Sequence, residues 1–441
     1  MKELIEVGAL QKGNVITKVV FLTPRPVASF EAEKWSFEYL RSEGFEVEVL
    51  DLTSLLNKNR STRDLLVRSV AEPLHGRFVH SPGIWSDFEK FVSEWAPNAL
   101  FVDYLVGAAD VGLREERVFR ILKKHRARYS FILSGALPMP SSIAVDFGGR
   151  RRVFGSKLAK AFAHPSKVLN FVASRVISFL TRRHLFYPLP DVIFSGNSST
   201  LERYVEARGF DRTKIVPIHS LDYDTSIVFR RGLEGQLPVA ENTCVFLDEA
   251  ATHHSDFEVL GMVPASPELY FKTMNRLFDT IEKTLGLAVV IAAHPRSNYE
   301  SRPDVFKGRV VVKGRTLDMV ARSKLVVMHA STSLSYAVLF RKPVLPVYIP
   351  GMPKNNSLNL MVDVMATAIG SSPIDVDKGE ISPSLLQRSC DLPKYAEYEE
   401  RYVKSEGLGD FETWEIVART LKAMASGNAS LHALQEARSW N

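Results

Sequence analysis

The chain has 441 residues, which is longer than one domain usually is and indicates two or three domains, each able to bury a core. Its composition, 45% hydrophobic and 24% charged, excludes a disordered or fibrous protein. Lys and Arg exceed Asp and Glu by 56 to 50, and the resulting charge of +6 suits a phosphate-bearing partner or an anionic membrane face but falls far short of a nucleic-acid-binding tract.

In the first half, strands and helices alternate. Residues 15–22 form a strong apolar strand, residues 31–44 have helical apolar spacing with Gly44 as a stop, and residues 45–52 alternate like a second strand. Further strands are expected at 99–108 and 128–138. Strand, helix and strand without a hairpin turn predict a parallel sheet. No Gly-x-Gly-x-x-Gly pattern follows the first strand, so an NAD-type dinucleotide fold is unsupported.

Residues 148–188 are basic and amphipathic. Arg175, Arg182 and Arg183 surround a set of apolar residues that could share one helical face: Val168, Leu169, Val172, Val176, Phe179 and Leu180. One interpretation is a helix lying on an anionic membrane surface. The other is a helix packed on the first domain with its basic side in solvent, which is the commoner role of such helices in large domains.

A second α/β series follows a segment rich in Gly, Pro and charge at residues 228–242, which we interpret as a linker. The series holds a helix over 266–286, with Ser266 as N-cap and Gly286 as stop. Its strands are expected near 244–248, 287–293, 308–313, 325–328 and 342–350. We therefore predict an α/β protein with two Rossmann-like parallel-sheet domains, residues 1–235 and 236–441.

The few cysteines and the lack of long apolar stretches indicate where in the cell the protein works. The two cysteines, Cys244 and Cys390, lack metal-ligand spacing, which indicates a reducing compartment without disulfides. The opening MKELIEVGALQKG is too acidic and too poor in apolar residues for a signal peptide, and no uncharged apolar stretch reaches the about 18 residues of a membrane span. We expect a cytoplasmic protein, with the basic segment allowing a peripheral contact at the inner face of the membrane.

Three stretches of the second half place polar groups directly after strands. Ser331, Thr332 and Ser333 follow the strand 325–328 and begin a helix, where hydroxyls and backbone N–H groups either hold an anion or merely cap the helix. His329 precedes them. Because carboxyl ends of parallel strands share one edge of a sheet, these groups are expected near a ligand crevice.

His294, Pro295 and Arg296 follow the strand 287–293. Pro295 biases His294 toward extended backbone, which holds the imidazole at the strand end. There it can donate to a phosphate oxygen or offset charge on a departing phosphate, and Arg296 adds a second cation. The alternative is that His294 only has a structural role at the end of the sheet and binds no ligand.

Asp248 and Glu249 end the first strand of the second series. A carboxylate pair there suits general-base or nucleophile work, although a capping or salt-bridged pair is an alternative. His253, His254 and Asp256 stand nearby, but their spacing is not a metal-ligand pattern, so no metal is expected.

The order of an acidic pair, a His-Pro pair and a Ser/Thr cluster resembles bacterial sialyltransferases and related CMP-sugar transferases of GT-B fold. The resemblance covers roughly residues 215–420 and implies two domains facing a cleft, with the last helix crossing back to the first domain. It implies that the acidic motif supplies the catalytic carboxylate and that a nucleotide site forms around His294, Pro295, Arg296, His329, Ser331, Thr332 and Ser333. The family's acidic motif usually ends in glycine, whereas Ala250 stands here, which leaves open which carboxylate acts and whether the sugar is sialic acid.

The implied reaction moves a nonulosonic acid or Kdo-type sugar from its CMP donor to a glycan or lipid-linked glycan of the cell surface, without metal or other cofactor. His294 and the hydroxyls would hold the phosphate as CMP departs, and the first domain would bind the acceptor. Asp248 would be the general base of an inverting transfer, or the nucleophile of a retaining one.

Three rivals remain. Transferases that build teichoic acids from CDP-glycerol or CDP-ribitol bear similar His-Pro and Ser-Ser signatures. UDP-sugar epimerases of GT-B fold share the plan but usually carry a Ser-Gly-Gly phosphate loop, whose glycines the sequence ASTSLS at 330–335 lacks. The third is a non-catalytic binding protein on a transferase fold.

Overall fold

The computed structural model describes residues 15–57, 59–68, 70, 72–105, 113–134, 137–140, 189–196, 211–233, 238–254, 257, 263–302, 304–378 and 381–425. The chain divides into two compact units, one of Met1–Ser134, Ala144–His219 and Ser405–Asn441 and the other of Gly135–Ile143 and Ser220–Lys404. The basic segment 148–188 lies outside the described residues, so both of its interpretations stay predictions. None of the helices in the described part of the chain is long and apolar enough to cross a bilayer.

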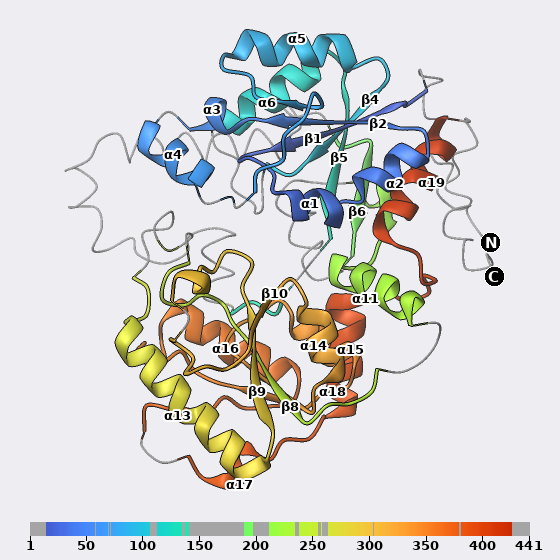
Figure 1. The fold of residues 1–441 in the computed structure, drawn as a ribbon. Coiled ribbons are helices and arrows are strands. Elements are labelled where there is room, and N and C mark those ends of the chain that lie inside the picture. The colour runs from blue at the N-terminus through green and yellow to red at the C-terminus, as the bar shows by residue number, and fades with distance from the viewer. Residues whose placement is uncertain are drawn as a thin grey trace, which may run out of the picture. The chain divides into compact units, whose positions relative to one another are not determined.

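The first unit is built on a seven-stranded parallel sheet in the order β3-β2-β1-β4-β5-β6-β7 (Figure 1). The central strands β1 and β4 are buried along their whole length, as apolar strands covered on both faces must be. The strands are β1 (Lys18–Thr23), β2 (Glu46–Asp51), β3 (Val79–His80), β4 (Ala99–Asp103), β5 (Arg128–Leu133), β6 (Val192–Ser195) and β7 (Ile215–Pro217).

Helices cover both faces of this sheet. Helices α5 (Trp85–Trp95) and α6 (Leu113–Lys124) lie on one face, packed against side chains such as Val20 and Phe101. On the other face Phe21 contacts the aromatic rings of Trp35, Phe37 and Trp414. These rings come from the region of α1 (Ser29–Lys34), α2 (Phe37–Ser42) and the C-terminal helix α19 (Thr413–Ala425), and the short helices α3 (Thr53–Leu56) and α4 (Arg60–Arg68) follow β2.

The single helix predicted over residues 31–44 is instead two helices, α1 and α2. Ser36 adopts a left-handed backbone with φ of 48°, which a continuous right-handed helix cannot contain. The predicted stop holds, because α2 ends at Ser42 and Gly44 has φ of 92°.

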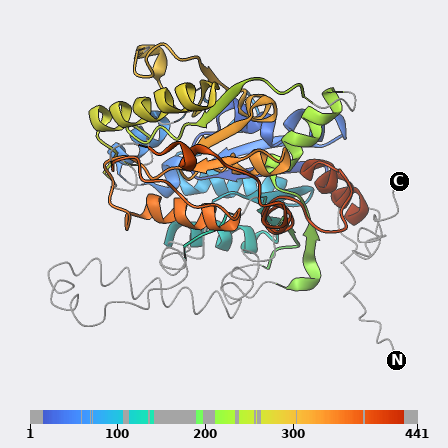
Figure 2. The same ribbon diagram turned by 90° about the horizontal axis from the view of Figure 1, so that it is seen from below.

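The second unit is built on a five-stranded parallel sheet in the order β10-β9-β8-β11-β12. Its helices lie on both faces, with α13 and α17 on one and α11, α14, α15, α16 and α18 on the other (Figures 1 and 2). The strands are β8 (Thr243–Leu247), β9 (Ala288–Ala293), β10 (Val311–Lys313), β11 (Leu325–Met328) and β12 (Val344–Pro346). The helices are α11 (Leu221–Gly232), α13 (Pro267–Leu285), α14 (Thr316–Arg322), α15 (Leu334–Leu339), α16 (Ser357–Ala368), α17 (Pro383–Leu386) and α18 (Leu392–Tyr398).

In each unit the first strand lies inside the sheet, and the next two strands extend the sheet on one side of it before the chain crosses to the other side. This is the Rossmann-like plan. It confirms the predicted fold class of two Rossmann-like parallel sheets, as in GT-B proteins.

The division between the units lies at His219 and Ser220, whereas the sequence placed a boundary at residues 235 and 236. Helix α11 explains the difference, because it runs through the first residues of the predicted linker and packs with the second sheet through Tyr223 and Ile227. The chain returns to the first unit at Ser405. Helix α19, in this last segment, ends the described part of the chain at Ala425.

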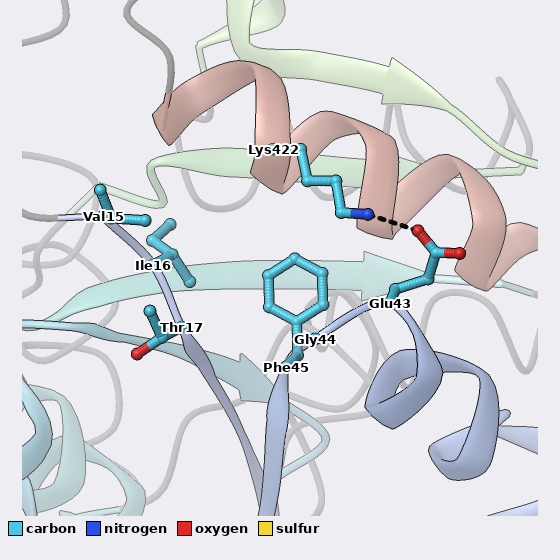
Figure 3. Close-up of a pocket in the computed structure, with 7 residues that line it drawn as sticks. All are labelled: Val15, Ile16, Thr17, Glu43, Gly44, Phe45 and Lys422. Atoms are coloured by element: carbon cyan, nitrogen blue, oxygen red, sulfur yellow. Dashed lines mark hydrogen bonds and ion pairs between the residues drawn. The ribbon is translucent and has the colours of Figure 1, made fainter.

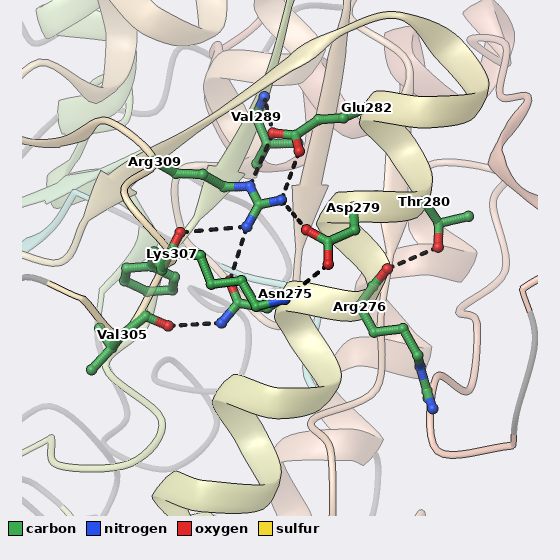
Figure 4. Close-up of polar contacts among 10 residues, drawn as sticks. Asn275, Arg276, Asp279, Thr280, Glu282, Val289, Val305, Lys307 and Arg309 are labelled. Carbon is green, nitrogen blue, oxygen red and sulfur yellow. Dashed lines mark hydrogen bonds and ion pairs between the residues drawn. The ribbon is translucent and has the colours of Figure 1, made fainter.

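A polar network fastens α13 to the second sheet at the amino end of β9 (Figure 4). Arg309 is its centre, with a side chain only 8% exposed. Its guanidinium donates to Glu282 at 2.9 and 2.6 Å, to Asp279 at 2.5 Å and to Asn275 at 3.0 Å. Glu282 also accepts from the backbone N–H of Val289 at 3.2 Å, so the network joins the helix to the strand directly.

Candidate functional site

The three predicted polar stretches meet at one edge of the second sheet. In the order β9-β8-β11 the strands that deliver them are neighbours, and all run parallel. After β8 the chain builds one side of the sheet and then crosses to β11 on the other side, so a topological switch point lies between their carboxyl ends. Open α/β sheets bind ligands at such a point.

Asp248, at the end of β8, is the structural centre of the site. Its side chain is buried, with 4% of the residue exposed. Oδ1 accepts from the backbone N–H of Ala250 at 3.1 Å and from the hydroxyl of Tyr299 at 2.9 Å, and Oδ2 accepts from the backbone N–H of His294 at 3.2 Å. Burial raises the pKa of Asp248, and these hydrogen bonds oppose the rise. Asp248 therefore fastens the exit of β9 to the exit of β8.

Glu249 is the other half of the acidic pair. The residue as a whole is partly exposed, but its Oε1 atom is buried and accepts no hydrogen bond from the described residues. Burial is the largest cause that raises the pKa of Glu249 to about 8; a hydrogen bond from the Ala330 backbone opposes the rise and the charge of Asp248 adds to it. Because Ala330 follows β11, Glu249 links the exits of β8 and β11.

Ala250 ends the acidic motif in a left-handed conformation with φ of 50°, although it is fully buried. An alanine there is strained by about 1–2 kcal/mol, whereas glycine is not. The position at which the resembling family usually has glycine thus has the backbone geometry that favours glycine. The sharp turn lets the Ala250 N–H reach back to Asp248.

His294 lies partly exposed at the end of β9. Its Nδ1 accepts from the backbone N–H of Arg296 at 3.1 Å, so the neutral ring carries its proton on Nε2. The ring of His254 stands edge-to-face with it, at 4.6 Å between centroids. Pro295 is exposed and Arg296 is partly exposed on the same turn.

The hydroxyl cluster stands between β11 and α15. Ser331 and Ser333 are partly buried and Thr332 is exposed. Ser333 is the N-cap of α15, but its side chain makes no capping hydrogen bond, and Ser331 Oγ accepts from the Ser333 N–H at a long 3.4 Å. The Ser333 hydroxyl therefore does not cap the helix.

His329 does not join this group. It is fully buried, its Nδ1 contacts the Val347 carbonyl oxygen at 2.7 Å and its Nε2 contacts the Tyr270 hydroxyl at 3.0 Å. Because a carbonyl only accepts, Nδ1 carries the proton and Nε2 accepts from Tyr270. Burial lowers the pKa of His329 to about 4, so the ring is neutral. With both nitrogens engaged in the core, His329 is unavailable to the nucleotide for which the sequence proposed it.

Tyr299 belongs to the site but was missed from the sequence. It is buried, donates to Asp248 and contacts the ring of His253 edge-to-face at 5.4 Å. Burial and the neighbouring Asp248 carboxylate raise the pKa of Tyr299, so the phenol stays protonated. The sequence feature that could have identified Tyr299 as a site residue is its position, five residues after His294 at the end of the same polar stretch.

Two more buried polar atoms lie in the loops after β8 and β9 without a hydrogen-bond partner among the described residues, His253 Nε2 and Ser297 Oγ. Native proteins seldom leave such atoms unpaired unless a ligand or water completes them. In the part of the chain that the structure describes, no three His, Cys, Asp or Glu side chains gather as metal ligands, and Asp256 lies outside that part.

A pocket of about 400 Å³ lies elsewhere, in the first unit (Figure 3). Val15, Ile16 and Thr17 line it before β1, Gly44 and Phe45 line it before β2, and the ion pair of Glu43 and Lys422 closes one side at 2.5 Å. The pocket thus lies at the amino ends of the strands, opposite the edge where α/β sheets bind ligands. We do not assign the site there.

No protein-family model matches the sequence, and no curated protein matches it. Several solved structures resemble the fold. The UDP-GlcNAc 2-epimerase of Methanocaldococcus jannaschii, in complex with UDP-GlcNAc and UDP, is 10% identical with a TM-score of 0.43 over 92% of this chain and 99% of that one. The wall teichoic acid polymerase TagF is 11% identical with a TM-score of 0.48 over 94% of this chain and 90% of that one. The UDP-GlcNAc 2-epimerase of Neisseria meningitidis, bound to UDP-GlcNAc, is 10% identical with a TM-score of 0.42 over 92% of this chain and 99% of that one. These likenesses concern the fold alone.

Proposed function

We propose that the protein is a GT-B-class transferase that takes a group from a nucleotide-activated donor and binds the donor phosphate at the carboxyl edge of the second sheet. One observation carries the proposal. The acidic pair joins all three polar stretches, because Asp248 holds the backbone of His294 and Glu249 interacts with the backbone of Ala330. Three stretches separated in sequence thus form one connected group at the switch point.

In this proposal, His294 and the hydroxyl cluster bind the donor phosphate. The Nε2–H of His294 donates to a phosphate oxygen, Arg296 adds positive charge, and Ser331, Thr332 and Ser333 donate hydroxyl hydrogen bonds. These groups stabilise the nucleotide as negative charge develops on it during departure. The acidic pair lies between them and supplies a proton acceptor for the attacking hydroxyl.

The donor we propose first is a CMP-activated nonulosonic acid or Kdo-type sugar, with a surface glycan or lipid-linked glycan as acceptor and the first unit as its binding site. A CDP-glycerol or CDP-ribitol donor is the second candidate, since it offers the same phosphate and nucleoside. A UDP-sugar is third, because residues 330–335 lack the glycine-rich phosphate loop. The named structural neighbours are UDP-sugar and teichoic acid enzymes, so a donor test must include both classes.

The test has two parts. Thermal stabilisation by CMP, CDP, UDP and GDP identifies the nucleoside, and release of nucleotide from CMP-sialic acid, CMP-Kdo, CDP-glycerol and UDP-GlcNAc identifies the donor. His294→Ala should reduce turnover by about 100-fold or more with the fold intact. His75→Ala, which removes an exposed histidine of the first unit, is the matched control. Normal turnover by His294→Ala, or no response to any nucleotide, would overturn the proposal.

A further inference from the structure

We infer that the two carboxylates of the acidic pair divide their work: Glu249 accepts the proton of the acceptor hydroxyl, and Asp248 is a positioning residue. The inference rests on the proposed function and assigns within it what the sequence left open. The sequence favoured Asp248 as base, and the hydrogen bonds around the two side chains favour the opposite assignment.

Both oxygens of Asp248 are already hydrogen-bonded, which leaves little acceptor capacity for a substrate proton. Its two oxygens already accept from three donors, the N–H of Ala250, the hydroxyl of Tyr299 and the N–H of His294. Two of these are backbone donors, which cannot turn away. A base must reach the proton that it abstracts at about 2.6–3.2 Å, directly or through one water. Instead, Asp248 holds the backbone of His294 in place.

Glu249, in contrast to Asp248, has an oxygen without a hydrogen-bond donor in the described part of the chain. Its Oε1 is buried and accepts no hydrogen bond from the described residues, while the Ala330 backbone interacts with the same carboxylate. A buried acceptor without a donor is costly, and a substrate hydroxyl is a donor of the right kind. The Glu249 carboxylate therefore takes no part in the hydrogen bonds that occupy Asp248.

The ionisable groups that face Glu249 suit this role. Burial is the main cause that raises the pKa of Glu249 to about 8, and the charge of Asp248 on the same strand end adds to the rise. Tyr270, from α13, also interacts with Glu249; burial and then the surrounding carboxylates keep its phenol protonated, and its hydroxyl donates to His329. Glu249 thus titrates close to neutral pH, as an efficient base does.

The transfer step then balances. As the acceptor hydroxyl oxygen forms its bond to the anomeric carbon of the donor, its proton passes to Oε1 of Glu249. The bond between the anomeric carbon and the nucleotide phosphate oxygen breaks, and its electron pair leaves with the phosphate. Glu249 later releases the proton to solvent.

The test compares Glu249→Gln with Asp248→Asn, and uses Glu268→Gln, an exposed carboxylate on α13, as control. For Glu249→Gln we expect unchanged CMP or CDP affinity and turnover reduced by about 100-fold or more. Wild-type turnover should rise with pH up to about 8, and the rise should vanish in this variant. For Asp248→Asn we expect nucleotide affinity lowered by about tenfold, because His294 loses its support, and the rise with pH retained. A pH rise that survives in Glu249→Gln but disappears in Asp248→Asn would overturn the assignment.

Folding stability gives a readout that needs no substrate. A carboxylate whose pKa is raised from 4.5 to about 8 by folding binds more protons in the folded state between these values, so stability falls as pH rises through this window and is fully present below it. The difference in stability between Glu249→Gln and the wild type should therefore grow over the window in favour of the variant. Parallel curves would overturn the inference. If no donor is consumed but the curves diverge as expected, the proposed function fails while the unusual state of Glu249 stands.

Discussion

The hydroxyl of Tyr299 donates to Oδ1 of Asp248 at 2.9 Å, so the residue that closes the histidine-bearing loop is tied to the end of the neighbouring strand. Together with the bond from the His294 N–H to Oδ2, this gives the loop two attachments to one carboxylate. A residue at the end of another strand therefore holds the backbone that carries the imidazole.

We expect Asp248→Ala to destabilise the protein by about 2–4 kcal/mol, because it leaves two backbone donors and one phenol without their acceptor. Tyr299→Phe removes one of the three bonds and should cost about 1 kcal/mol. Urea unfolding of the two variants measures both values. Equal stability of Asp248→Ala and the wild type would mean that the carboxylate does not hold the loop.

Ala250→Gly should leave stability unchanged or raise it by up to about 1 kcal/mol, because relief of the left-handed strain offsets the loss of a buried methyl group. Ala251→Gly is the matched control, since Ala251 is also buried but has no positive φ. We expect that control to cost about 1 kcal/mol or more. Thermal unfolding of both variants tests the difference, and equal losses would contradict the strain at Ala250.

The strand ends could be predicted because an apolar run followed by polar residues marks the exit of a buried strand. That reasoning placed Asp248, His294 and Ser331 at the same edge of one sheet. It could not supply the strand order, which makes β8 the neighbour of both β9 and β11. Nor could it supply the bond between Asp248 and His294, which joins residues 46 positions apart.

His329 shows where the same reasoning fails. It stands at a strand end beside three hydroxyls, as a ligand-binding histidine would, yet its ring turns into the core. The partners that hold it there, Tyr270 on α13 and Val347 after β12, come from distant parts of the chain. Tertiary packing therefore decided the role of this residue, and no local pattern carried that information.

The stability of the protein should depend on His329 in acid. Folding lowers the pKa of this ring from 6.5 to about 4, so the unfolded state binds the proton first as pH falls. The stabilising contribution is full above pH 6.5 and is lost as pH falls toward 4, by up to about 3 kcal/mol. In His329→Gln the loss between about pH 7 and about pH 5 should shrink, measured by urea unfolding.

His125→Gln, on a partly exposed histidine of the first unit, should keep the acid sensitivity of the wild type. His329→Gln should also bind CMP or CDP with wild-type affinity, because the ring does not reach the ligand. A loss of nucleotide affinity in a folded His329→Gln variant would restore the role that the sequence suggested for this residue.

Arg309→Met should destabilise the second unit without changing nucleotide affinity. The guanidinium is nearly buried and donates to Glu282, Asp279 and Asn275, so its removal leaves partly buried acceptors unpaired. We expect a cost of about 2 kcal/mol, discounted because the Asp279 carboxylate is half exposed. Arg309→Lys should cost nearly as much, because an ammonium cannot reproduce the planar fork that reaches two carboxylates at once.

We would measure urea unfolding and CMP or CDP binding for both Arg309 variants, with Lys307→Met as the matched control. Lys307 pairs with the same Asp279 at 3.0 Å but is largely exposed, so its loss should cost well under 1 kcal/mol. The network lies at the amino end of β9, where Glu282 holds the Val289 N–H, whereas His294 stands at the carboxyl end of the same strand. Weakened nucleotide binding in a folded Arg309→Met variant would contradict this separation of a stabilising edge from a ligand-binding edge.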